Sequence, residues 1–481
     1  MNNIVLLMAD QWRWDTLFQE GHICQTPNLH AFADRGVAFT NAYTACPLCT
    51  PARAALMTGK WPYQANLTDN VSGTMFYPHG KLFPGLKTYL ERLRDDAGCS
   101  IAYSGKWHLG AGTLLERGIT DVRASDGGSD GRAGFQPPIL DGEKLAPFYG
   151  SFSQGIGWDQ HVIEQGMAQI TKLASADGPF CAVISTPGPH FPHFVPQEYL
   201  AHYADLLADS WPANFSAPFT EQGKPAMQAR PYWPCQNTRP LTPEDWRKTC
   251  QHYWAYCAHL DEQFGRVLAE LDALGLADNT VVAFTADHGE MLGGHGMFDK
   301  GPYLYEEAVR IPMIVRDPAG RAPRGQDGFV NLRDLFPTLI DLAGAGYVLD
   351  EDERGRSFWA TDNPETFVCY DQYQGRLFRI RGMRTGYWKY NWSPHDVCEL
   401  YDLQADPGER VNLAGAPACA ALQSDLHARL AAWMEAEGDY LLCAHHLLPP
   451  GTYVDGRGAD EQHDHGWSTE EWAWFRRGGL E

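Results

Sequence analysis

Two long apolar runs in this chain each end at a pair of polar side chains. One run, residues 5–9, precedes Asp10 and Gln11, and the other ends directly before Asp287 and His288. A continuous apolar run is typical of a parallel strand that is buried on both faces. Because ligands bind at the carboxyl ends of such strands, these polar groups are candidate metal ligands.

Shorter apolar runs alternate with helical stretches along the chain. Residues 101–103 and 181–185 predict two further strands, and Thr242-Pro243 opens a long helix that reaches about Leu274. This alternation favours an α/β fold with a parallel or mostly parallel sheet. In the last quarter of the chain, residues 379–390 instead predict strands of a small antiparallel sheet.

A short helix is predicted beside Cys49. Thr50 is the expected N-cap, Pro51 the first helical residue, and Gly59 the end of the helix. Free N–H groups at the start of a helix attract anions, so residue 49 would lie at an anion-binding position. Alternatively, Cys49 is a plain buried cysteine or pairs with Cys46 in a Cys-x-x-Cys redox or metal motif.

The sequence Cys-Thr-Pro-Ala-Arg at residues 49–53, followed by Thr58-Gly59, resembles the signature at which type I sulfatases convert a cysteine to formylglycine. The other segments described here occur in the order found in that family, so the resemblance spans most of the chain. Hydrated formylglycine offers one oxygen to attack sulfur and a second hydroxyl whose later deprotonation expels sulfate. Neither a serine nor an unmodified cysteine offers that pair of oxygens.

Membership of this family, within the alkaline phosphatase superfamily, implies a particular architecture and activity. The expected fold is α/β, with a large mixed, mostly parallel sheet flanked by helices and a smaller C-terminal α+β subdomain. We expect the catalytic domain at residues 1–365 and the subdomain at residues 366–481. The implied reaction is hydrolysis of a sulfate monoester of a small organic substrate, either a sulfated saccharide or an aryl sulfate.

The resemblance also implies one divalent cation. Its expected ligands are Asp10, Gln11, Asp287, His288 and the modified Cys49. Oxygen donors favour a hard ion, so calcium is the first choice, and the single imidazole leaves manganese or magnesium open.

Cationic groups complete the implied site. Lys106 and Lys300 would bind sulfate, and Arg53 would stabilise the ionised hydrate and the carboxylates. Lys106 and His108 lie two residues apart, so on an extended segment both would face the same side.

Two histidines have separate implied roles. His108 would remove a proton from the formylglycine hydrate, and His190 would contact the leaving-group oxygen. His193 is a competitor for the second role.

Two features resemble a subgroup that contains choline sulfatases and phosphonate monoester hydrolases. These are the Asp10-Gln11 pair and Asn70, which would lie near the substrate. A phosphonate or phosphate ester hydrolase and a choline sulfatase are therefore alternatives, although Lys106 and His108 match the sulfatase pair. A catalytically silent anion-binding protein is a third hypothesis.

Composition limits the partners. A net charge of −22 over 481 residues, with no long basic run, argues against nucleic acid. We find no signal-peptide pattern and no apolar stretch long enough to span a membrane. The 12 cysteines are scattered, so we expect them to be mostly reduced and the protein to be cytoplasmic. The expected partners are a small-molecule sulfate ester and, during maturation, a formylglycine-generating enzyme; a homo-oligomer stays open.

Overall fold

The structure is a computed structural model, and it describes most of the chain. The described residues are 1–19, 21–70, 80–110, 113–123, 135–204, 214–215, 223–232, 236–321, 328–344, 357, 363–394 and 396–441.

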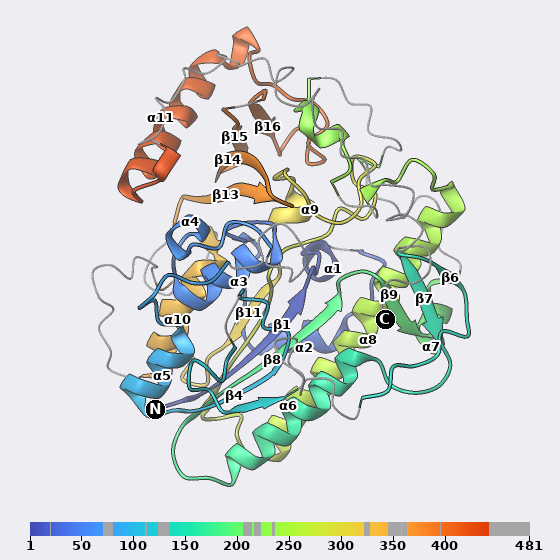
Figure 1. Cartoon of the computed structure of the whole chain (residues 1–481), viewed down its shortest axis with the longest axis vertical. Coiled ribbons are helices and arrows are strands. Elements are labelled where there is room, and N and C mark those ends of the chain that lie inside the picture. The colour runs from blue at the N-terminus through green and yellow to red at the C-terminus, as the bar shows by residue number, and fades with distance from the viewer. Residues whose placement is uncertain are drawn as a thin grey trace.

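A seven-stranded sheet forms the centre of the molecule, in the order β2-β11-β10-β1-β8-β4-β5 (Figure 1). In that order the strands are Val37–Ala38, Met313–Arg316, Thr280–Ala286, Asn3–Asp10, Phe180–Pro189, Ser100–Gly105 and Asp121–Arg123. β10, β1, β8, β4 and β5 are parallel, whereas β11 is antiparallel to both of its neighbours, β10 and the edge strand β2. The predicted mixed, mostly parallel sheet is therefore confirmed.

The register of the parallel strands brings their carboxyl ends to one edge. Ala9 of β1 lies opposite Ala286 of β10, and Asp10 lies opposite Pro189 of β8. Gly105, the last residue of β4, lies opposite Ser185 of the same β8. The residues that follow these strands therefore start from neighbouring points.

Helices cover both faces of this sheet, and β1 shows why. Its residues Ile4, Leu6 and Met8 pack into one apolar cluster, while the alternate residues Val5 and Leu7 pack into another. Burial of each such side chain contributes about 1.5–3 kcal/mol. The first cluster contains α3 (Cys49–Thr58), α5 (Tyr89–Ala97) and α10 (Leu335–Ala343); the second contains α2 (Pro27–Asp34), α6 (Trp158–Ala174) and α8 (Pro243–Ala273).

The helix α8 is the long one predicted from the sequence. Thr242 caps it, because its side chain accepts a hydrogen bond from the N–H of Asp245. The helix ends at Ala273, one residue before the expected end.

The predicted antiparallel sheet is also confirmed, and it lies beyond the carboxyl edge of the main sheet at the top of Figure 1. Its strands are β13 (Glu365–Tyr373), β14 (Arg376–Thr385), β15 (Trp388–Trp392) and β16 (Glu399–Asp402), and α11 (Ala420–Ala436) packs against it. The N–H of Cys369 in β13 donates to the carbonyl oxygen of Ala45, 2.9 Å away. The sheet is therefore joined directly to the segment that precedes Cys49. The boundary between residues 365 and 366 stays a prediction, and residues 442–481 lie outside the described part of the chain.

Smaller elements complete the molecule. A three-stranded sheet contains β6 (Lys144–Leu145), β7 (Tyr149–Phe152) and β9 (His193–Pro196), and a two-stranded one contains β3 (Ala42–Tyr43) and β12 (Val330–Asn331). The short helices are α1 (Asp15–Phe18), α4 (Pro62–Ala65), α7 (Gln197–Leu200) and α9 (Glu306–Val309).

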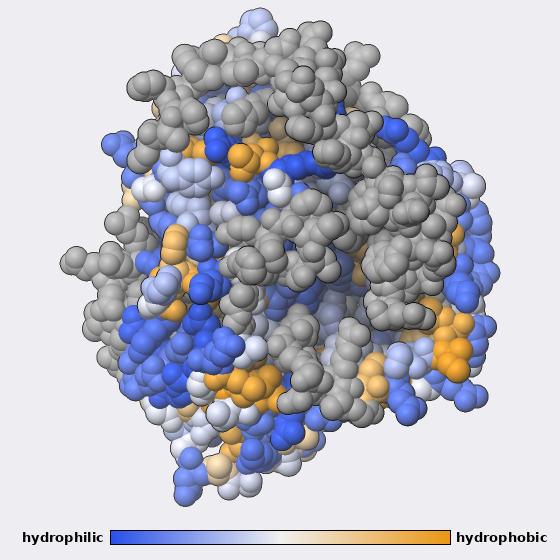
Figure 2. Space-filling view, viewed as in Figure 1, coloured by the Kyte–Doolittle hydropathy of each residue, from blue (hydrophilic) through white to orange (hydrophobic). Residues whose placement is uncertain are grey.

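The described surface is predominantly hydrophilic on the face shown in Figure 2, where the apolar patches are small. Among the described residues, no helix combines the length and the apolar composition that crossing a membrane requires.

Candidate active site

Cys49 is the first residue of α3, so the helix begins earlier than predicted. The N-cap is Leu48, which is extended, and the N–H of Ala52 donates to its carbonyl oxygen over 2.9 Å. Thr50 is therefore helical and is not the cap. Pro51 is tolerated as the third helical residue because the first N–H groups of a helix have no partner within the helix. The predicted end is confirmed, since Gly59 has φ of +67°.

Four potential metal-ligating side chains converge at Cys49. The ligand atoms of Asp10, Cys49, Asp287 and His288 all lie within 4.8 Å of one another, and all four residues are buried. Cys49 Sγ lies 3.2 Å from His288 Nε2 and 3.9 Å from Asp10 Oδ1, where the oxygens of formylglycine would lie if the residue were modified.

The electrostatics of this group fit a cation. Burial, with the charge of Asp10 beside it, raises the pKa of Asp287 to about 6. Two buried carboxylates this close repel each other, and a divalent ion would relieve that repulsion. Two carboxylates and one imidazole suit a hard ion such as calcium, magnesium or manganese better than zinc.

Arg53, one turn after Cys49, ties the two carboxylates together. Its Nη2 lies 2.8 Å from Asp10 Oδ2, and its Nε lies 2.9 Å from Asp287 Oδ2. A third nitrogen, Nη1, donates to Ser185 Oγ and to the carbonyl oxygen of Lys106. The guanidinium therefore connects α3 to groups at the ends of β1, β10 and β4 and to Ser185 within β8.

Lys106 contacts the site through Asp10, with 2.6 Å between its Nζ and Asp10 Oδ2. The turn at Gly105 allows Lys106, the next residue, to reach this place beside Asp10. The φ of Gly105 is +98°, and a Cβ there would lie 2.0 Å from the carbonyl oxygen of Ser185. Only glycine fits this turn.

The expected extended segment from Lys106 to His108 is wrong. β4 ends at Gly105, and His108 has φ of +50°, so strand alternation does not orient its side chain. The Nδ1 atom of His108 is buried and has no hydrogen-bond partner among the described residues. The structure thus brings Lys106 to the group but records no hydrogen bond between His108 and Cys49.

Lys300 and His190 form the other side of the site. Lys300 Nζ lies 2.6 Å from His190 Nε2 and 3.1 Å from Asp299 Oδ1. His190 Nδ1 lies 2.6 Å from the carbonyl oxygen of Phe191. By contrast, His193 packs against the rings of Tyr253 and Phe298.

Gln11 is more extensively bonded than the sequence suggests. Its side-chain Oε1 accepts a hydrogen bond from Lys300 Nζ over 2.8 Å, and its Nε2 donates to Asp299 and Glu290. Its N–H donates to Asp287 Oδ1 over 3.0 Å. The side-chain amide therefore positions Lys300, and its role as a metal ligand stays a prediction.

Asn70 contacts α3, because its Oδ1 accepts a hydrogen bond from the N–H of Thr50 over 3.0 Å. Its contact with substrate stays a prediction.

The position of Cys49 stabilises negative charge. Burial and Asp10 would raise the pKa of the Cys49 thiol, but Lys106, Lys300 and His288 outweigh them and hold that pKa well below its usual value. Cys46 and Cys49 are both free, so the two do not form a disulfide.

Three residues of the site were not assigned a role from the sequence. Glu290 and Asp299 hold the side chain of Gln11, and Ser185 accepts a hydrogen bond from Arg53. Glu290 lies two residues after His288, and Asp299 directly precedes Lys300; this proximity is the only signal that could have indicated them. Ser185 lies within an apolar strand and gives no such signal.

Comparison with known proteins decides the family. The sulfatase family model matches residues 2–345. The chain belongs to the sulfatase family. A second model, described as N-sulphoglucosamine sulphohydrolase, C-terminal, matches residues 293–436. The predicted enzyme class, a sulfatase of the alkaline phosphatase superfamily, is therefore confirmed.

Individual relatives match most of the length of this sulfatase. This chain is 29% identical over 478 residues to an ulvan-active sulfatase of Formosa agariphila, and the match covers 95% of this chain and 85% of that protein. It is 29% identical over 456 residues to a choline-sulfatase of Rhizobium meliloti, covering 86% and 83%. A phosphonate monoester hydrolase of Agrobacterium radiobacter shares the fold, with a TM-score of 0.71, 23% identity and coverage of 92% and 97%.

Proposed function

We propose that this sulfatase hydrolyses a sulfate monoester of a saccharide, with Cys49 converted to formylglycine and one divalent cation bound beside it. The observation that carries the proposal is the convergence of Asp10, Asp287 and His288 on the first residue of α3. Lys106 and Lys300 add positive charge at the same point, which suits an anionic ester.

The chain would hold the cation through Asp10, Asp287 and His288, with calcium as the first choice and magnesium or manganese as alternatives. The cation would polarise the sulfate group, and the hydrated formylglycine would supply an oxygen nucleophile. Arg53 keeps Asp10 and Asp287 in place, because one rigid guanidinium bonds to both. Lys106 would balance the charge of the bound sulfate.

The proton for the leaving oxygen comes from Lys300 in this proposal. A carbonyl oxygen only accepts, so the short contact with Phe191 places a proton on His190 Nδ1. Burial and Lys300 lower the pKa of His190, so its ring is neutral and Nε2 accepts from the Lys300 ammonium. Lys300 therefore holds the proton, and His190 orients Lys300.

His108 is the proposed base for the second half of the reaction. Its buried, unpartnered Nδ1 is an available proton acceptor within the described structure. It would take the proton of the second hydroxyl, so that sulfate leaves and the aldehyde returns.

A saccharide is the favoured substrate class because two matches carry saccharide names. The C-terminal family model names N-sulphoglucosamine, and the relative from Formosa agariphila is named for activity on ulvan. The choline-sulfatase relative keeps choline sulfate as the second candidate. Aryl sulfates and phosphonate esters complete the set to be tested.

The test combines mass spectrometry of the peptide containing residue 49 with assays of purified protein on four kinds of ester. These are sulfated mono- and disaccharides, choline sulfate, an aryl sulfate, and the matching phosphate and phosphonate esters. We expect formylglycine at residue 49 and the highest kcat/KM on a sulfated saccharide. Cys49→Ala should be inactive, whereas the matched variant of its buried neighbour, Cys46→Ala, should retain activity. Full activity with an unmodified thiol, or preference for a phosphonate ester, would overturn the proposal.

A further inference from the structure

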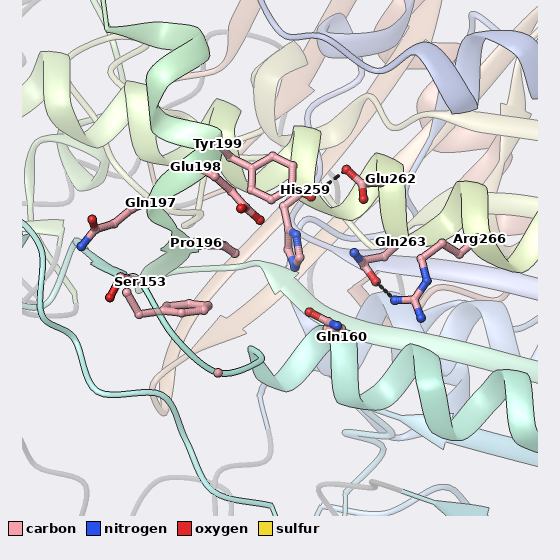
Figure 3. Close-up of a pocket in the computed structure, with 12 residues that line it drawn as sticks. Ser153, Gln160, Pro196, Gln197, Glu198, Tyr199, His259, Glu262, Gln263 and Arg266 are labelled. Carbon is pink, nitrogen blue, oxygen red and sulfur yellow. Dashed lines mark hydrogen bonds between the residues drawn. The ribbon is translucent and has the colours of Figure 1, made fainter.

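A cavity lies apart from the site around Cys49, and none of its lining residues belongs to that site. Its volume is about 560 Å³, within the roughly 300–1,000 Å³ typical of small-ligand sites. The start of α6, the end of β9, the helix α7 and the middle of α8 surround it (Figure 3).

His259 of α8 is the most informative side chain of this cavity. It is only 3% exposed, and its Nδ1 has no hydrogen-bond partner among the described residues. In Figure 3 its ring projects into the group of lining side chains. Burial lowers its pKa to about 4, so the ring is neutral at physiological pH. An unpaired buried polar atom is costly, and a turn of the His259 ring that brings Nδ1 to a ligand hydroxyl in the cavity would remove that cost.

The neighbouring polar side chains are held in place and still have bonding capacity. Gln160 donates through Nε2 to Glu164 over 3.0 Å, and Gln263 accepts through Oε1 from Arg266 over 2.6 Å. Gln160 therefore offers an acceptor oxygen to the cavity, and Gln263 offers donor N–H groups. Tyr199 donates to Glu262 over 2.7 Å, which fixes the tyrosine ring edge-on to His259.

Two kinds of ligand fit this cavity poorly, an anion because of charge and a metal ion because of ligand geometry. Glu198 and Glu262 line the cavity with a single cation, Arg266, which also lies 3.7 Å from Glu164. An anion such as sulfate would be repelled. A metal ion is not favoured either, because the cluster of metal-ligating atoms found within the described residues is the one at Cys49.

We propose that this cavity binds an uncharged saccharide unit, so that an unsulfated part of a saccharide chain is held at a second site on the enzyme. Amides, carboxylates and a neutral imidazole can bond to ligand hydroxyl groups, while Phe152, Pro196 and the Tyr199 ring supply apolar surface. The identification of the ligand rests on the saccharide substrate class proposed above.

The experiment measures binding without turnover. Wild-type protein is titrated in a calorimeter with neutral tetrasaccharides of glucose, galactose, rhamnose and N-acetylglucosamine. At least one should bind, and His259→Leu should weaken that binding about tenfold, whereas His259→Asn, which keeps a polar atom near the place of Nδ1, should stay within about threefold. Glu198→Ala changes an exposed residue of the cavity, so it does not disturb the core, and it should also weaken saccharide binding. Glu270→Ala, a matched change elsewhere on α8, should bind like wild type.

Activity separates this proposal from the previous one. His259→Leu should hydrolyse a small sulfate ester with unchanged kcat/KM, because the cavity does not contact the Cys49 site. If wild type binds none of the four saccharides, or if His259→Leu and Glu198→Ala both bind like wild type, the second site is refuted. If neutral saccharides bind through His259 but no sulfated saccharide is hydrolysed, the proposed substrate fails while the second site stands.

Discussion

The charges around Cys49 and those that join α9 to the C-terminal sheet are both buried, but they are balanced differently. In the second group, Lys389 of β15 lies 3.0 Å from Glu306 and 2.8 Å from Glu409. Tyr43 donates to Glu306 over 2.7 Å. Although burial opposes it, Lys389 and Arg384 lower the pKa of Glu306 to about 2. Each named charge in this group has an opposite charge from the protein itself.

At Cys49 the cations are also paired with carboxylates, Lys106 with Asp10 and Lys300 with Asp299, but they act in addition on residue 49 itself. Lys106, Lys300 and His288 all favour negative charge at residue 49, where the protein supplies a thiol that is neutral when protonated. The Lys106 side chain keeps 13% exposure, against 3% for Lys389. The charges around Lys389 pair with one another and stabilise the fold, and we call them the closed group. The charges around Cys49, which we call the open group, also act on a reactive side chain and are available for chemistry.

Removing a carboxylate from the open group should have the largest effect. In Asp287→Asn we expect turnover to fall on the order of 10³-fold, because a cation that polarises sulfate is worth several kcal/mol in the transition state. Bound metal, measured by mass spectrometry, should fall in parallel, while the melting temperature changes little. The matched variant Asp261→Asn alters a buried carboxylate that bonds only to Asn28 and Leu29 in the recorded contacts, and it should keep its metal. Unchanged metal content and rate in Asp287→Asn would contradict the assignment.

Breaking the closed group should affect stability instead of turnover. Lys389→Met removes the nearest cation from both Glu306 and Glu409, although Arg384 remains beside Glu306, so we expect a loss of about 3 kcal/mol in the free energy of unfolding by urea. Turnover per folded molecule should be unchanged. The double variant Lys389→Met/Glu409→Gln should recover part of the loss, because one buried charge is removed. If Lys389→Met lowered kcat at full stability, the distinction between the two groups would be wrong.

The two histidines of the open group should differ in which step they slow. His190→Ala should slow the first step about 10²-fold, most for poor leaving groups, because Lys300 loses the partner that orients it. His108→Ala should permit the first step and trap a sulfated enzyme. Intact-mass measurement after mixing with substrate detects that adduct. Rapid release of the first alcohol without any adduct would count against the role of His108.

The smallest expected effect concerns a buried group that carries no charge. Burial lowers the pKa of His252 to about 4, below the value near 6.5 of an unfolded chain. The unfolded state therefore binds more protons between these values, and stability is lost as the pH falls from about 6.5 toward 4. His252→Phe keeps the ring stacked on Tyr149 and removes the titration.

Between pH 7 and pH 5.5, the free energy of unfolding in urea should fall by about 1 kcal/mol less in this variant than in wild type. His202→Gln, which alters an exposed histidine, serves as the control. Equal acid sensitivity in His252→Phe and wild type would show that His252 does not contribute.

Strand ends could be predicted from the sequence, but turns and networks could not. Apolar runs locate Asp10 and Asp287 because a strand that is buried on both faces consists almost entirely of apolar residues. The turn at Gly105 depends on the carbonyl oxygen of Ser185, 80 residues later in the chain, and no local pattern records that approach. The predicted N-cap of α3, Thr50, is wrong because the actual N-cap, Leu48, has no side chain that could form a capping hydrogen bond.

The chemical roles of the site residues stay predictions, because the position of a side chain does not by itself establish its role. The cytoplasmic location and the oligomeric state likewise stay predictions.

If Cys49 is converted to formylglycine, as proposed, its burial sets a time limit on that modification. The residue is 1% exposed in the folded protein, and its neighbour His288 follows it by 239 residues. At about 5–20 residues per second, a ribosome needs roughly 12–48 s to make that stretch, and until then the pocket around residue 49 cannot close. A modifying enzyme that requires access to the side chain would have to act within this interval or on a chain that has not yet folded. Conditions that speed folding relative to modification should therefore leave a larger fraction of the protein permanently unmodified.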